Sequence, residues 1–587
     1  MKRVYRQCRS VCLCLGLLAW SGMLSPLLAQ NLQVTSASPD TTPQGTISLD
    51  VTIGGSGFKK GAKAAWFLSG TTNPAGVTVN STAFVSSTQL TANITVSDTA
   101  TIGSFDVVVY SSGRTGKGTG LFSVTEKGSS SGCTTLGTPG NFTLATTLNY
   151  VNSSGTAQYQ TKLGLNVTVR PVTVTDGVQS KEIIVAAVGT GNGNGKLEIF
   201  FLDPANGQVL DGQSLFSGGP VQPHYTIVTN PNLTGAVGAV GGDLNGDAIP
   251  DFVVARNDSN DLAILVGHMD GAGILTYGSP IIFNPSPTSP LFYGDNGKAI
   301  GDLDGENGDE LAVGVFGGKN RGKTTYGAVN IYKLSGSDVV LIHTVNDPLL
   351  DASDTFGGPM AIGDVTGDGA PDLVAAAHNT TVGGAAEAGM IFVFPAPLTS
   401  SSSFRLTGGT TGDHIGYQVG LGILTNSTAT DVVATTSWPG ATSTSTTNPR
   451  ALIYSGPITS NRTASSFDFV PYPDLDEGWA SRLDIGDMTG DGRVEVLVGA
   501  PIATNSTSCT TGAGAAHLYL SNPSNPGQPA LTVFQPPDLD TGYGGFGFGI
   551  AVVPYSLGNP TLLLVGERSR EVGGVAGAGQ VYVYKQN

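Results

Sequence analysis

A nine-residue acidic loop recurs along most of this 587-residue chain. Its four strongest copies lie within residues 242–254, 301–313, 363–374 and 486–498. In each copy, side chains that carry oxygen occupy positions 1, 3, 5 and 9 of the loop, and a short apolar run follows at once. A pattern that returns in the same register predicts that the chain repeats one structural unit.

Seven such units can be aligned. Three further segments, residues 182–185, 431–433 and 561–565, keep the apolar run but lack most of the loop. The alignment places position 1 at residues 174, 243, 302, 364, 423, 487 and 553, so the spacing between units runs from 59 to 69 residues. Repeats in this range indicate stacked or radial supersecondary units.

The strands of one unit can be predicted from its apolar runs. Residues 360–362, 373–377 and 390–394 are predicted strands, and residues 403–406 a weaker fourth. Four antiparallel strands in each of seven units predict an all-β fold, a seven-bladed β-propeller over residues 141–587. A flat solenoid is the main alternative.

The end of the chain predicts how the ring would close. The last unit ends at its third strand, residues 580–584, and therefore lacks an outer strand. Residues 142–148 precede the first unit and have the composition of a strand. We predict that they complete the last unit, which would leave no exposed sheet edge at the junction.

The composition agrees with short strands joined by tight turns. The chain has 84 glycines and 33 prolines, and its hydrophobic share of 39% is enough to build a core, which argues against disorder. The net charge of -16 disfavours nucleic acid as a partner, because nucleic-acid binding needs clustered Lys and Arg.

The N-terminus has the layout of a secretory signal peptide. Lys2, Arg3, Arg6 and Arg9 precede an apolar run at residues 11–24, and a cleavage site is expected before Gln30. We therefore expect residues 1–29 to be removed, which takes away four positive charges and changes the net charge from -16 to -20. The mature protein is expected to have no transmembrane span and to be secreted, extracellular or at the cell surface, or periplasmic in a Gram-negative bacterium. A permanent membrane anchor is the alternative.

Removal of this segment would leave two of the five cysteines, Cys133 and Cys509. Export permits a disulfide bond between them. Because they lie far apart in the sequence, it stays open whether they pair or remain two free thiols.

Residues 30–125 consist of short runs that alternate apolar and polar residues between glycine-rich turns, which predicts a small β-sandwich. Ser38-Pro39, residues 51–58 and residues 103–109 resemble the IPT/TIG branch of immunoglobulin-like domains. That resemblance implies a spacer or an interaction module. Residues 126–140 have the composition of a linker.

The repeats themselves resemble FG-GAP repeats, the units of the integrin α-chain propeller. Phe356-Gly357 and, more loosely, Tyr293-Gly294 precede the acidic loop, residues 499–501 follow the apolar strand in one unit, and residues 579–584 match the third strand. The resemblance spans roughly residues 141–587. It implies a calcium-binding β-propeller used mainly in cell adhesion and recognition.

Loop chemistry favours calcium independently of that resemblance. Ca²⁺ takes six to eight oxygen ligands at about 2.3–2.6 Å. Carboxylates as close as these repel one another unless a cation lies between them. We therefore predict about four Ca²⁺ sites with a structural role. The predicted ligands are Asp243, Asn245, Asp247 and Asp251; Asp302, Asp304, Glu306 and Glu310; Asp364, Thr366, Asp368 and Asp372; and Asp487, Thr489, Asp491 and Glu495.

Three of these residues should affect how well their sites bind calcium. Glu306 is longer than the usual Asp, which alters the expected geometry of its site, and Thr366 and Thr489 are neutral ligands that should bind calcium more weakly. The alternative for all four loops is a tight turn without metal, because Asp and Gly both suit sharp bends.

No catalytic constellation is recognisable in the sequence. The six histidines are scattered singly, and neither an HExxH nor a GxSxG motif occurs. We therefore expect a non-enzymatic adhesion or recognition protein whose partner is an extracellular protein or glycan. The alternatives are a carbohydrate-active enzyme on a propeller scaffold and a structural component of the cell envelope.

Overall fold

The computed structural model describes residues 32–43, 49–97, 100–125, 141–149, 163–190, 196–228, 239–255, 261–285, 297–315, 327–350, 355–398, 403–425, 429–436, 450–464, 468–469, 482–501, 514–521, 530–536, 545–555, 559–572, 575 and 577–587. The predicted signal peptide at 1–29, the predicted linker at 126–140 and both cysteines, Cys133 and Cys509, lie outside these ranges.

The chain divides into two compact units, Met1–Lys127 and Gly128–Asn587. Every helix or strand assigned in the described ranges is a β-strand, so the prediction of an all-β fold is confirmed. In the same ranges, no helix is long and apolar enough to cross a membrane.

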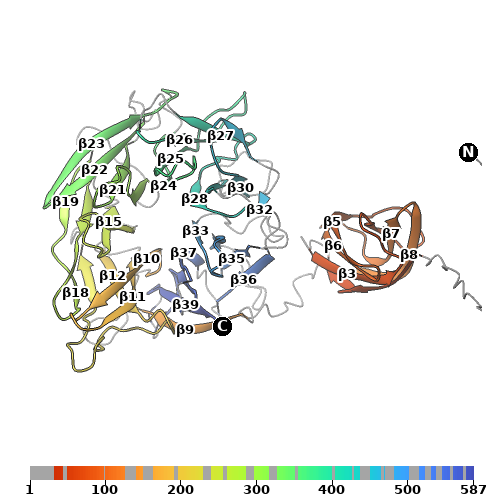
Figure 1. The fold of residues 1–587 in the computed structure, drawn as a ribbon, viewed down its shortest axis with the longest axis horizontal. Coiled ribbons are helices and arrows are strands. Elements are labelled where there is room, and N and C mark those ends of the chain that lie inside the picture. The colour runs from red at the N-terminus through yellow and green to blue at the C-terminus, as the bar shows by residue number, and fades with distance from the viewer. Residues whose placement is uncertain are drawn as a thin grey trace, which may run out of the picture. The chain divides into compact units, whose positions relative to one another are not determined.

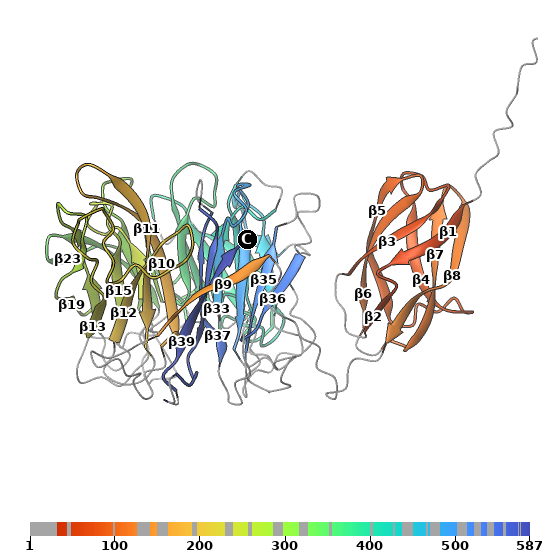
Figure 2. The same ribbon diagram turned by 90° about the horizontal axis from the view of Figure 1, so that it is seen from below.

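Unit 1 consists of two four-stranded sheets that share one core (Figure 2). Their strand orders are β1-β3-β6-β5 and β2-β8-β7-β4, and β2 runs parallel to β8. Trp66 is 1% exposed and meets Phe122 edge to face, with 5.9 Å between the ring centroids. The strands are β1 (Gln33–Ser38), β2 (Thr41–Pro43), β3 (Leu49–Ser56), β4 (Lys63–Leu68), β5 (Val77–Ser86), β6 (Gln89–Val96), β7 (Gly103–Ser111) and β8 (Arg114–Thr125).

In the part of unit 2 that the structure describes there are seven further sheets with at least four strands each, and neighbouring strands within each of these four-stranded sets are antiparallel. In chain order the sheets are β10 (Asn166–Thr175), β11 (Ser180–Gly189), β12 (Lys196–Leu202) and β13 (Tyr225–Val228); β14 (Ala239–Gly242), β15 (Asp251–Ala255), β16 (Leu262–Leu265) and β19 (Ile281–Phe283); β20 (Lys298–Gly301), β21 (Glu310–Val315), β22 (Ala328–Ser335) and β23 (Asp338–Asn346); β24 (Met360–Gly363), β25 (Asp372–Ala377), β26 (Met390–Phe394) and β27 (Phe404–Thr407); β28 (Gln418–Gly422), β29 (Asp431–Thr435), β30 (Ala451–Tyr454) and β32 (Asp468–Phe469); β33 (Arg482–Gly486), β34 (Glu495–Ala500), β35 (Ala515–Leu520) and β36 (Ala530–Phe534); and β37 (Phe546–Val553), β38 (Leu562–Glu567), β39 (Gln580–Gln586) and β9 (Phe142–Leu148).

Unit 2 also has a short strand added to the edge of a sheet and a separate hairpin. The short strand β31 (Arg462–Thr463) joins the edge strand β27 in parallel, and β17 (Gly267–Met269) pairs with β18 (Leu275–Tyr277) in a separate hairpin. The β31 addition covers part of an edge that would otherwise present unpaired backbone groups.

The first strands of the seven sheets form a continuous circuit. Each of β10, β14, β20, β24, β28 and β33 contacts the first strand of the next sheet, and β37 contacts β10 again. Figure 1 shows the sheets of unit 2 around a common centre. Core residues fill the space between neighbouring sheets. Val374 and Ile391 from one sheet, for example, pack with Val432 and Leu452 from the next.

The last sheet joins strands from the two ends of unit 2. Strand β9 pairs antiparallel with β39, from Phe142 opposite Gln586 to Leu148 opposite Val581. Phe142 is 3% exposed and meets Phe534 at 5.1 Å between ring centroids. The prediction that residues 142–148 complete the last unit is therefore confirmed for the strand pairing.

Candidate metal centre

The acidic loops all connect the first strand of a sheet to its second strand. In five sheets a glycine at the end of the first strand pairs with the residue at position 9, which begins the second strand. The pairs are Gly242 with Asp251, Gly301 with Glu310, Gly363 with Asp372, Gly422 with Asp431, and Gly486 with Glu495. The loops therefore occupy equivalent places at one end of the strands.

The acid at position 9 is fully buried and accepts hydrogen bonds from backbone amides of its own loop. The Asp251 carboxylate accepts from Leu244 N of its loop at 2.8 Å and, from outside the loop, from Gly267 N of β17 at 2.9 Å. Equivalent bonds run from Val365 N and Thr366 N to Asp372, from Met488 N to Glu495, and from Leu303 N to Glu310. Position 9 thus ties the loop to the second strand, a role that the sequence did not reveal.

In the fifth sheet the acid at position 9 has this structural role although its loop lacks the predicted set of metal ligands. Its loop has no carboxylate at position 1, which is Ile423, yet Asp431 accepts from Leu424 N at 2.9 Å, Thr425 N at 2.7 Å and Gly456 N at 2.8 Å. Buried backbone amides need acceptors whether or not an ion is bound. Asp431 therefore has the structural role of position 9 in a loop that has no carboxylate at position 1.

The acid at position 1 shapes the turn itself. The Asp364 carboxylate accepts from Gly367 N at 2.6 Å and Gly369 N at 2.9 Å, and both glycines have positive φ angles of 78° and 87°. Glycine adopts such angles without the steric cost of a Cβ atom. In the loop of β33 and β34, Asp487 likewise accepts from Gly490 N and Gly492 N. These local bonds explain why Asp and Gly alternate in the motif.

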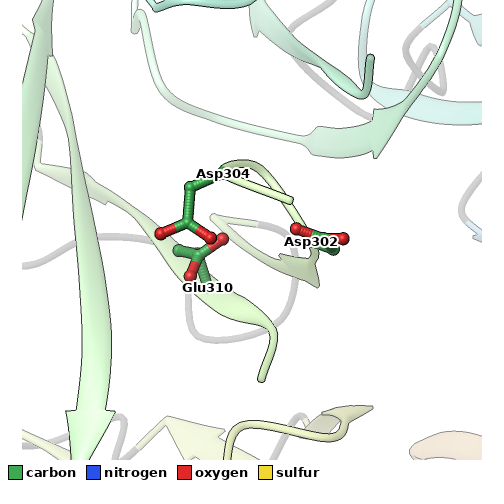
Figure 3. A group of neighbouring side chains, drawn as sticks. All are labelled: Asp302, Asp304 and Glu310. Carbon is green, nitrogen blue, oxygen red and sulfur yellow. The ribbon is translucent and has the colours of Figure 1, made fainter. Parts of the chain in front are cut away.

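One loop brings three carboxylates together. One oxygen each from Asp302, Asp304 and Glu310 lie within 4.8 Å of one another (Figure 3). Oxygens that share one Ca²⁺ at about 2.4 Å can be at most about 4.8 Å apart, so this group fits the ion. Among the described residues, no other set of three His, Cys, Asp or Glu side chains meets that spacing.

Glu310 differs from the other position 9 acids in its second oxygen. Oε2 accepts from Leu303 N at 2.8 Å, whereas Oε1 is buried and lies 3.4 Å from the ammonium of Lys333. In Glu495 the corresponding Oε1 accepts from the Ser521 hydroxyl at 2.6 Å. Oε1 of Glu310 thus faces a cation, whereas Oε1 of Glu495 faces a hydroxyl group.

A lysine from the third strand of the same sheet lies beside this group. The Nζ atom of Lys333 is 3.0 Å from Asp304 Oδ2 and 3.4 Å from Glu310 Oε1. Burial opposes ionisation of Asp304, but its hydrogen bond with Lys333 outweighs that effect and lowers its pKa. Lys333 therefore supplies part of the positive charge that the loop needs.

The remaining predicted ligands lie in their loops without converging in this way. Glu306, the residue that departs from the Asp pattern, is exposed and lies outside the Asp302 group. Asn245 donates to Asp247 at 3.0 Å, and the hydroxyl of Thr366 lies 3.4 Å from Asp372. Burial raises the pKa of Asp251 to about 7 and also raises the pKa of Asp372 and Glu495.

The loops also bond to one another across neighbouring sheets. Asp309 N donates to Asp243 O at 2.7 Å, and Asp243 N donates to Asp309 Oδ2 at 2.8 Å. Between the fifth and sixth sheets, Val494 N donates to Ile423 O at 2.9 Å. A loop held in shape therefore also holds the junction between two sheets.

In the fifth sheet, substitution of the acid at position 9 should lower the stability of the protein and leave its calcium stoichiometry unchanged. Asp431→Ala leaves the amides of Leu424, Thr425 and Gly456 without their acceptor, which should lower the free energy of unfolding by about 3 kcal/mol. Denaturant unfolding measures the loss, and calcium stoichiometry measured in parallel should stay at the wild-type value. A changed stoichiometry would show that this loop also binds metal.

A second charged group lies away from the loops. His224 is flanked by Glu198, with Nε2 to Oε2 at 3.0 Å, and by Asp211, with Nδ1 to Oδ2 at 2.8 Å. Burial disfavours the imidazolium, but the hydrogen bonds that it donates to Asp211 and Glu198 prevail and raise the pKa of His224 to about 9. Because the three residues are far from a recognisable motif, only the fold reveals the group.

The raised pKa of His224 predicts a dependence of stability on pH. The stabilisation is complete below the unfolded value of about 6.5 and is lost as pH rises through about 9. The melting temperature of the wild type should therefore exceed that of His224→Gln at pH 7, and the difference should shrink by pH 10. Thermal melts of both proteins across this range test it, and a constant difference would contradict it.

Comparisons with known proteins leave the family open. No family model and no curated protein matches the chain. Among solved structures, the exotype rhamnogalacturonan lyase YesX aligns with a TM-score of 0.36 and 12% identity over 94% of this chain and 90% of that one. A putative phosphatase from Bacteroides thetaiotaomicron aligns with a TM-score of 0.34 and 10% identity over 95% and 98%. At these values the likeness assigns neither a family nor an activity.

Proposed function

We propose that unit 2 is a seven-bladed β-propeller stabilised by calcium, and that the protein is a non-enzymatic extracellular recognition module. The observation that carries the metal assignment is the group formed by Asp302, Asp304 and Glu310. The circuit of first strands and the pairing of β9 with β39 support the propeller assignment. Unit 1, with its two packed sheets, would serve as the spacer or second contact that its IPT/TIG-like sequence implies.

In this proposal the ion has a structural task. Bound Ca²⁺ would neutralise the repulsion between carboxylates and link the start of the loop to the second strand. Asp302 and Asp304 would hold it from the loop, and Glu310 from the first residue of β21. Asp309 would pass the resulting rigidity to the neighbouring sheet through its bonds with Asp243.

Removal of Lys333 should increase the calcium affinity of the Asp302 group. The ammonium lies within 3.4 Å of two of the three carboxylates and therefore repels an incoming cation. In Lys333→Met the affinity should rise about tenfold, a change expected for one charge near a protein surface. The variant should also be less stable than the wild type in chelator, because Glu310 loses its cation, and calcium should restore it. Isothermal titration and paired melts measure both effects.

Recognition itself needs a ligand screen. Labelled full-length protein should bind a small subset of extracellular glycans or matrix proteins on an array, and chelation should weaken that binding if the loops hold the ligand-facing surface in shape. Turnover of any polysaccharide in a parallel panel would favour the carbohydrate-active alternative. Absence of ligands on both panels would favour a structural component of the envelope.

A further inference from the structure

Three residues gather at the end of the strands that is remote from the acidic loops. Arg482 is the first residue of β33, and that strand leads away from it to the loop at Asp487. Phe548 lies near the start of β37, and Arg568 follows the end of β38. The group therefore lies at the junction of the last two sheets of unit 2.

The backbone of β37 is distorted where Phe548 lies. Its register with β38 shifts between Phe546 and Ile550, which marks a bulge. Glycines flank Phe548 on both sides, and a Cβ atom at Gly547 would collide with the carbonyl oxygen of Ala515. A bulge of this kind redirects a side chain out of the regular alternation of a strand. Here the redirected ring lies beneath two guanidinium groups.

Both guanidinium groups lie over the same ring. Cζ of Arg568 is 3.7 Å from the centroid of Phe548, and Cζ of Arg482 is 5.7 Å from it. A cation is attracted to the face of an aromatic ring within about 6 Å. The ring thus fixes the arginine side chains before any ligand arrives, which reduces the entropy that binding would cost.

The positive charge of Arg568 has no carboxylate partner among the described residues. The neighbouring acid Glu567 accepts a hydrogen bond from the Tyr582 hydroxyl at 2.6 Å and lies 4.0 Å from Arg570. Burial and the adjacent charge of Arg482 lower the pKa of Arg568, which reflects the cost of placing two cations together. Two adjacent arginines thus lie at one place in a chain whose net charge is -16.

We propose that Arg482, Phe548 and Arg568 form a binding site for a carboxylate or sulfate group of a ligand. Guanidinium groups recognise such oxyanions through paired N–H donors, and a half-buried site strengthens the attraction. The site uses different residues from the acidic loops and lies at the other end of the strands. It does not depend on the proposed calcium function.

Isothermal titration of the full chain at constant ionic strength tests the site. The probes are sodium galacturonate for a carboxylate, sodium sulfate for a sulfate, and galactose as the uncharged match for galacturonate. At least one of the two anions should bind and galactose should not. Arg568→Gln should weaken the binding by about tenfold or more, the effect expected when one charged hydrogen-bonding group is lost.

Two further variants keep the result interpretable. Arg405→Gln removes an exposed arginine from the edge strand β27 and should leave anion binding unchanged. Arg568→Lys keeps the charge but lacks the planar pair of donors, so it should bind more weakly than the wild type even if Arg568→Gln fails to fold. The proposal is overturned if neither anion binds the wild type, if Arg568→Lys binds as tightly as the wild type, or if Arg405→Gln loses binding equally.

Discussion

Chelation of calcium should lower the melting temperature of the full chain by several degrees. One site at a calcium concentration a hundredfold above its Kd contributes about 2.7 kcal/mol to stability. With an unfolding entropy near 2.1 cal/mol/K per residue, that corresponds to about 3 °C for a unit the size of unit 2, and to about 10 °C if four sites are occupied. The size of the shift therefore reports how many loops bind.

The Asp302 loop provides a matched pair of variants for this experiment. Asp304→Asn removes a carboxylate from the converging group, whereas Glu306→Gln removes an exposed carboxylate from the same loop that lies outside it. The first should reduce the calcium-dependent shift by about 3 °C and the second should not. Equal melts with calcium and with EDTA in the wild type would refute the metal assignment altogether.

Loss of strand β9 should destabilise unit 2 more than any single loop variant. Deletion of residues 141–148 exposes the outer edge of β39 and removes Phe142 and Leu148 from the core, where they are 3% and 1% exposed. Phe142→Ala alone should cost about 3–5 kcal/mol, because it leaves a cavity beside Phe534. Denaturant unfolding of the full chain measures both effects.

The same strand supplies the control. Leu144 is 41% exposed, so Leu144→Ala removes a leucine from β9 without opening the core. Its effect should stay below about 1 kcal/mol, because surface substitutions away from special features change stability little. If Phe142→Ala and Leu144→Ala destabilise equally, strand β9 does not act through core packing.

The strands and turns that are specified by residues close together in the sequence could be predicted from the sequence. Apolar runs after each loop became second strands, and each position 9 acid became the first residue of its strand, as at Asp251 and Asp372. Asp and Gly at neighbouring positions specify a tight turn through bonds within a few residues. The partner of the last sheet was also predictable, because a missing outer strand and an unused apolar segment, residues 142–148, were both visible in the chain.

Other features depend on residues that only the fold brings together. Lys333 lies 29 residues after Asp304 in the sequence, and Arg482 begins β33 whereas Arg568 follows β38 of the next sheet. No local periodicity encodes such contacts, because they arise from the register and curvature of separate strands. The sequence by itself therefore determined the repeated unit and the place of its acidic loops. Only the tertiary structure decided which carboxylates converge and which arginines lie over one aromatic ring, since both follow from distances across the sheets.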